Sequence, residues 1–102
     1  MNAATERLIL DGPVGNIDVA LDRPAGIASG VAVIAHPHPL YGGTRDNKVV
    51  QTLARALVQI GFACWRPNFR GVEGSDGTHD EGIGETEDLL AVLDAARRHP
   101  CL

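Results

Sequence analysis

The chain has 102 residues, of which 44% are hydrophobic and 22% charged, and its formal net charge is −4. This length and composition fit one small globular domain and exclude an intrinsically disordered chain. The acidic balance argues against nucleic acid or an anionic membrane surface as a partner. No apolar run reaches the roughly 18–20 residues that span a bilayer, and the N-terminus MNAATERLIL lacks the pattern of a secretory signal. We therefore predict a cytoplasmic protein that binds neither nucleic acid nor membrane.

The N-terminal third has the pattern of a β-hairpin. Glu6–Leu10 is a short β-prone run, and Asp11–Gly15 is dense in turn residues. In Asn16–Leu21 apolar residues then alternate with Asp18 and Ala20, which is a period of two. This pattern predicts an antiparallel hairpin with one buried face.

Strands and helices alternate in the rest of the chain. Val31–Ala35 is apolar throughout and predicts a strand covered on both faces. Asn47–Ile60 and Ile83–Arg98 have helical spacing, and the short apolar run Phe62–Trp65 predicts a strand between them. A long glycine-rich loop, Asn68–Gly82, precedes the second helix, and loops of this length are usually functional or disordered. The first helix places its apolar side chains on one stripe: Val50, Leu53, Ala54, Leu57 and Ile60.

The predicted order is therefore β-β-β-α-β-α. Strands that alternate with helices indicate an α/β fold, with a mostly parallel sheet after the N-terminal hairpin. The second helix ends at Pro100, just before the end of the sequence. This order is typical of a βαβ array that is interrupted before its next strand.

The histidines raise the question of a metal site. His36 and His38 would share one face of a regular strand, and His79 and Asp80 are further potential ligands. The prolines that follow each of the first two histidines make that stretch irregular, and the other two candidates lie in a remote loop. The two cysteines form no CxxC pair, and Cys64 lies in an apolar run that predicts a buried thiol. We predict no metal and no cofactor.

The glycine-rich loop suggests two further chemistries, and neither fits. The string GVEGSDG (Gly71–Gly77) is not a P-loop motif, and it neither follows a strand directly nor opens a helix. A serine nucleophile would stand in GxSxG at a sharp strand-to-helix turn, whereas Ser75 stands in EGSDG, eight residues after Pro67. Ser29 precedes an apolar strand. Neither serine is predicted to be a nucleophile.

The segment AHPHPLYGGTRDN (Ala35–Asn47) lies between a predicted strand and a predicted helix. A turn shaped by proline and glycine at this place can direct backbone N–H groups at a developing oxyanion. Proline has no N–H, so only His38, Leu40 and Tyr41 can donate between positions 37 and 41. The alternative is a connection with a purely structural role.

With these residues the chain resembles the α/β-hydrolase superfamily, and more narrowly its small bacterial hydrolases that carry HPHPxxGG. His36-Pro37 stands where the family has the His-Gly of its oxyanion loop. Asn68–Ser75 is similar to the family's RGxGxS loop after the fourth strand. The resemblance covers essentially the whole chain and implies a single, incomplete α/β-hydrolase domain over residues 1–102.

The resemblance implies a doubly wound sheet and a Ser–His–acid triad that attacks a small-molecule ester or similar acyl bond. The family's nucleophile follows the next strand and its acid and base come later, so this chain alone is expected to be inactive. The positions carried over are oxyanion donors, the backbone N–H groups of His38 and Leu40. Binding or supporting positions are also carried over: His36, Tyr41, Gly42, Asn68 and Arg70.

Two further expectations follow. In the family's sheet the strand at Val31–Ala35 has a neighbour on each side, so in this chain it would be an open apolar edge that favours self-association. The alternative function is a non-catalytic α/β module that binds a small ligand or a protein at the Ala35–Asn47 segment.

Overall fold

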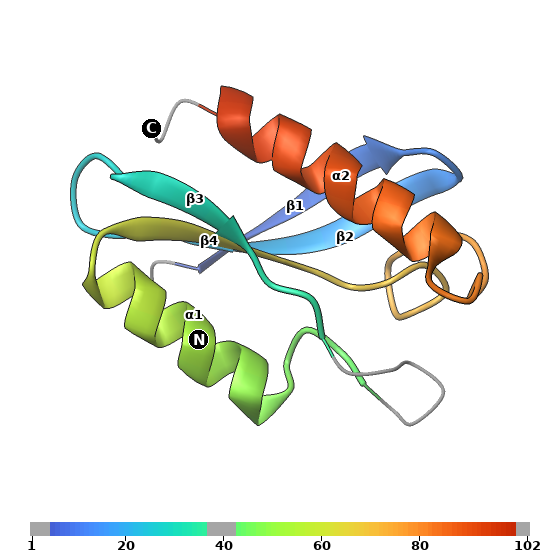
Figure 1. The fold of residues 1–102 in the computed structure, drawn as a ribbon, viewed down its shortest axis with the longest axis horizontal. Coiled ribbons are helices and arrows are strands. Elements are labelled where there is room, and N and C mark those ends of the chain that lie inside the picture. The colour runs from blue at the N-terminus through green and yellow to red at the C-terminus, as the bar shows by residue number, and fades with distance from the viewer. Residues whose placement is uncertain (1–4, 37–42, 100–102) are drawn as a thin grey trace.

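A computed structural model describes residues 5–36 and 43–99. The described residues form four strands and two helices in the predicted order (Figure 1). Their bounds are β1 (Thr5–Gly12), β2 (Gly15–Asp22), β3 (Gly30–Val33), α1 (Lys48–Gln59), β4 (Phe62–Pro67) and α2 (Ile83–Arg98). Neither helix has the length and apolar character needed to cross a membrane.

The strands form one mixed sheet in the order β1-β2-β4-β3. β1 pairs antiparallel with β2, and β2 pairs antiparallel with β4. β3 and β4 are parallel, as predicted for the part after the hairpin, and α1 connects them. Figure 1 shows α1 on one face of the sheet and α2 on the other. This arrangement confirms the predicted α/β class.

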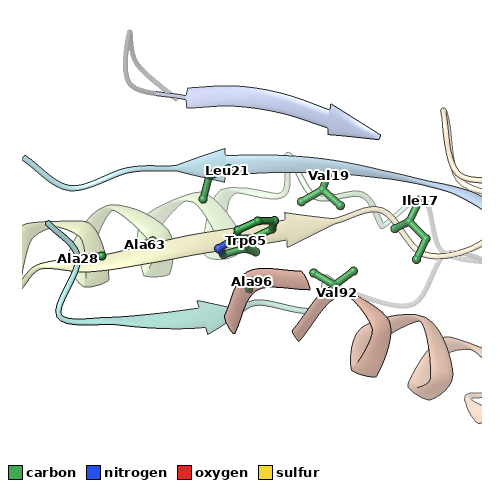
Figure 2. Packing of buried hydrophobic residues seen from close by; sticks show 8 residues of the cluster. All are labelled: Ile17, Val19, Leu21, Ala28, Ala63, Trp65, Val92 and Ala96. Atoms are coloured by element: carbon green, nitrogen blue, oxygen red, sulfur yellow. The ribbon is translucent and has the colours of Figure 1, made fainter. Parts of the chain in front are cut away.

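The main core lies between the sheet and α2. Figure 2 shows side chains of β2 and β4 meeting the inner side of this helix. The alternating apolar residues of β2 all point to this face, as their period of two predicts. The buried cluster consists of Ile17, Val19, Leu21, Ala28, Ala63, Trp65, Val92 and Ala96.

A smaller core lies between the sheet and α1. Asn47 caps this helix, because its Oδ1 accepts hydrogen bonds from the backbone N–H groups of Val49 (2.9 Å) and Val50 (3.4 Å). Of the predicted stripe, Val50 and Ala54 are buried, whereas Leu53 is 49% and Ile60 67% exposed. The predicted stripe is thus wider than the face that packs, because the helix contacts mainly one strand, β4.

The prediction of a hairpin with one buried face is wrong for β2. Asp18 and Ala20, on the face opposite the main core, are 0% and 3% exposed. β2 is an interior strand, and polar side chains from the residues before α1 and from β4 cover its second face. The predicted buried strand Val31–Ala35 also differs, because β3 ends at Val33 and each of its residues is only partly buried.

Candidate functional site

The carboxyl ends of β3 and β4 lie side by side because the two strands are parallel and Val33 pairs with Trp65. Just beyond these ends, the Nε2 atom of His36 accepts a hydrogen bond from the backbone N–H of Phe69 at 2.9 Å. The imidazole ring of His36 and the phenyl ring of Phe69 are also in contact, with centroids 4.4 Å apart. His36 is buried, and its Nε2 atom carries no proton in this arrangement. The imidazole therefore ties the end of β3 to the end of β4.

The predicted site residues fall into two groups. His38, Leu40, Tyr41 and Gly42 lie outside the described residues, so their assigned roles stay predictions. The other three, His36, Asn68 and Arg70, are described and buried.

Asn68 connects three parts of the chain. Its Oδ1 accepts a hydrogen bond at 2.9 Å from the backbone N–H of Arg45, a residue between β3 and α1. Its Nδ2 donates to the Asp18 carboxylate at 3.4 Å, and its backbone N–H donates to the Asp18 carbonyl oxygen at 2.9 Å. Asn68 thus holds the end of β4, the residues before α1 and β2 together.

Asp18 is the charged centre of this arrangement. Its carboxylate accepts a hydrogen bond from Arg45 Nη1 at 2.6 Å and two from Arg7 Nη2 at 3.1 Å. Asp18 is fully buried and Arg45 is 4% exposed. Burial raises the pKa of Asp18, but hydrogen bonds from Arg45 and Arg7 lower it by more, so this pKa lies below its ordinary value. The carboxylate is therefore ionised at neutral pH.

A second acid on the same strand extends the network. Asp22 lies four residues after Asp18 and therefore on the same face of β2. Its carboxylate accepts hydrogen bonds from Arg66 Nε at 2.6 Å and Arg66 Nη2 at 3.2 Å, and both side chains are 1% exposed. Arg66 Nη1 donates to the carbonyl oxygen of Arg45 at 3.1 Å. We call the five residues Asp18, Asp22, Arg45, Arg66 and Asn68 the buried polar cluster.

Ser75 supports this cluster from the glycine-rich loop. Its Oγ donates to the carbonyl oxygen of Asn68 at 2.8 Å and accepts from the backbone N–H of Asp18 at 2.9 Å. Gly74 lies so close that a Cβ there would be 2.7 Å from Asp18 Oδ2. The Ser75 residue is buried, and both of these hydrogen bonds of its hydroxyl are to the main chain.

Arg70 contacts α2. Its Nε and Nη2 donate to the two carboxylate oxygens of Asp88 at 2.9 and 2.8 Å, and Nη2 also donates to the carbonyl oxygen of Gly84 at 2.8 Å. The side chain is 7% exposed. In this structure Arg70 thus anchors the first turns of α2 to the loop after β4, and its binding role stays a prediction.

We compared the chain with known proteins. No protein-family model matches it, but a curated protein and several solved structures are similar to it. An uncharacterised protein of Rickettsia prowazekii (strain Madrid E) is 41% identical over 88 residues, which are 86% of this chain and 37% of that protein. An α/β serine hydrolase homologue from Coxiella burnetii is 49% identical with a TM-score of 0.89, over 97% of this chain and 48% of that one. An α/β serine hydrolase without a lid from Xanthomonas campestris is 42% identical with a TM-score of 0.86, over 95% and 46% of the two chains.

This chain has the fold of the N-terminal part of an α/β hydrolase. The similarity to these serine hydrolases supports the assignment of the chain to the α/β-hydrolase superfamily. The chain spans about half the length of the two solved structures and 37% of the Rickettsia protein.

The described part of this hydrolase fold contains no group of three His, Cys, Asp or Glu side chains that could hold a metal ion. His36 is bound to Phe69, and the Nδ1 atom of His79 lies 3.1 Å from a carboxylate oxygen of Glu85. The structure thus brings neither histidine into a set of described metal ligands.

The sequence pattern did not reveal the buried polar cluster as a unit. The alternation in β2 placed Asp18 on a solvent face, and Arg45 lies 27 residues away in the chain. The sequence did contain one indication of this cluster, because Asp18 and Asp22 lie four residues apart and therefore on one face of a strand. If that face is covered, two acidic side chains there need cationic partners.

Proposed function

We propose that this chain is the N-terminal portion of a serine-type α/β hydrolase and contributes the oxyanion loop for hydrolysis of a small-molecule ester or similar acyl bond. One observation carries the proposal. His36, before the 37–42 segment, is bound to Phe69, and Arg45, three residues after it, is bound to Asn68, so residues on both sides of the segment are held beyond the carboxyl ends of β3 and β4. Open α/β sheets bind their ligands at this edge.

The backbone N–H groups of His38 and Leu40 are the proposed donors to the oxyanion. Pro37 and Pro39 have no backbone N–H, so between positions 37 and 40 only His38 and Leu40 can donate. The His36 imidazole supports the loop and is not a base, because its Nε2 already accepts the Phe69 N–H. No serine of the 102 residues stands in GxSxG, so the nucleophile, acid and base belong to the part of the fold that follows in the longer relatives.

A chimera tests the proposal. Residues 1–102 are fused to the part of the Coxiella burnetii hydrolase homologue that lies beyond the matched region, and hydrolysis of p-nitrophenyl acetate is measured. We expect the chimera to hydrolyse the ester and the 102-residue chain to show no turnover. His38→Pro removes one donor and should lower kcat by about 10²–10³-fold.

His38→Ala is the matched control, because it removes the imidazole and keeps the backbone N–H. We expect it to retain most of the activity. If His38→Ala is as damaging as His38→Pro, the side chain and not the backbone is the active group. A chimera that folds but hydrolyses no activated ester would favour the non-catalytic binding module instead.

A further inference from the structure

We propose that Asp18 is a positioning residue that fixes the place of Arg45, which follows the proposed donor segment in the connection between β3 and α1. This inference rests on the proposed function, under which that connection carries the oxyanion donors. Asp18 lies on β2, outside the loop itself, and acts through Arg45.

Arg45 is held at three points although it lies in irregular structure. Its guanidinium donates to Asp18 at 2.6 Å, its backbone N–H donates to the side chain of Asn68 at 2.9 Å, and its carbonyl oxygen accepts from Arg66 at 3.1 Å. Of these three contacts, only the one to Asp18 joins two buried groups of opposite charge, and such charge-assisted bonds are among the strongest hydrogen bonds in proteins. Arg45 thus has little freedom to move while Asp18 stays in place.

Asp18 is itself fixed from several sides. Its backbone N–H donates to Ser75 and its carbonyl oxygen accepts from Asn68, while the carboxylate lies so close to Gly74 that a Cβ there would be 2.7 Å from Oδ2. Arg7 binds the same carboxylate from β1, but its side chain is 68% exposed and it lies on a strand outside the loop. The position of Arg45 is therefore fixed relative to the strands of the sheet and does not depend on contacts with solvent.

The energetics favour a positional role over a purely stabilising one. Burying an ion pair costs desolvation free energy that its attraction only partly offsets, and a packed apolar pair often gives equal or greater stability. What an apolar pair lacks is a fixed direction. The hydrogen bond between Asp18 and Arg45 fixes the position of the chain at residue 45. This residue lies three positions after residue 42, where the proposed donor segment ends.

Amide hydrogen exchange on the 102-residue chain tests the inference. Two probes report on the loop: the N–H of Arg45, bound to Asn68, and the N–H of Phe69, bound to His36. The N–H of Val92, in the core helix α2, reports on global stability. In Asp18→Asn we expect exchange at Arg45 to accelerate about tenfold more than exchange at Val92, since a bond to a charged group is lost.

Two variants complete the experiment. Arg7→Gln removes the exposed partner of the same carboxylate and should leave exchange at Arg45 unchanged relative to Val92. Arg45→Gln, a second route if Asp18→Asn does not fold, should raise exchange at Phe69 relative to Val92, and Arg45→Lys should restore part of the protection. Equal acceleration at loop and core probes, or no acceleration at Arg45, would overturn the inference. The measurement needs no turnover, so it can fail while the chimera is active, or succeed while the chimera is inactive.

Discussion

The guanidinium of Arg70 lies against the backbone of Gly84, so close that a Cβ on Gly84 would overlap the Nη1 atom. The same guanidinium is held by Asp88, one turn further along α2. Gly84→Ala therefore has to displace a buried charged group from its partner. We expect a loss of about 3 kcal/mol in the free energy of unfolding, because breaking a buried ion pair leaves uncompensated charge.

Urea unfolding followed by the fluorescence of Trp65, the single tryptophan, measures this change. Glu87→Ala, at an exposed position of the same helix, is the control and should change stability by less than about 0.5 kcal/mol. A Gly84→Ala protein as stable as wild type would show that Arg70 relocates without cost.

Val92 is the central contact of α2 with the sheet. It is fully buried in the cluster around Trp65, whereas Leu90 on the same helix is 60% exposed. Val92→Ala should lower the free energy of unfolding by roughly 2 kcal/mol, because it removes apolar contacts and leaves a cavity. Leu90→Ala should have a much smaller effect in the same urea titration, and similar losses for the two would contradict the packing of α2 described above.

The thiol of Cys64 should be unreactive in the native state. Burial, and next the nearby charge of Asp22, raise the pKa of its thiol to about 11, and its Sγ lies 3.6 Å from the carbonyl oxygen of Ala54. Because the folded pKa is above the ordinary value of 9.0, the thiol's contribution to stability is present below pH 9 and is lost as pH approaches about 11. In a Cys101→Ser background, reaction with a disulfide reagent at pH 8 should occur only through unfolding, so native-state modification faster than global unfolding would count against this.

Two carboxylates make the protein sensitive to acid. The pKa of Asp18 is lowered as described above; burial raises the pKa of Glu85, but hydrogen bonds from backbone N–H groups, including those of Asp80 and Gly82, lower it by more. Groups with depressed pKa values stabilise the fold above their unfolded pKa, so this stability should disappear as pH falls below about 4. Urea midpoints measured at decreasing pH should fall steeply for wild type and less steeply for Asp18→Asn. Equal slopes would show that Asp18 titrates normally.

The two edges of the sheet should differ in self-association. β1 carries the charged residues Glu6, Arg7 and Asp11, which protect an edge, whereas β3 consists of Gly30–Val33 and has no charge. We expect the apparent mass in sedimentation to rise with protein concentration, and amides of β3 to become more protected while those of β1 do not. A concentration-independent monomer would contradict this prediction.

Local patterns determined the elements and their order. The period of two in Asn16–Leu21, the helical spacing of Ile83–Arg98 and Pro100 after its end act within a few residues, so they predict the elements and the bounds of α2. The α/β class followed from that order, and the glycine- and proline-rich segment after the third strand was identified from residue types alone.

Only the tertiary structure decided the role of the charged residues. Period-two alternation cannot distinguish a solvent face from a face covered by distant chain, so it placed Asp18 at the surface, although Arg45 and Asn68 bury it. Likewise the sequence alone suggested Arg70 as a binding residue, and its contacts with Asp88 and Gly84 appear only once α2 packs beside the loop after β4. These pairings depend on contacts between residues 14 to 50 positions apart, which no local periodicity encodes.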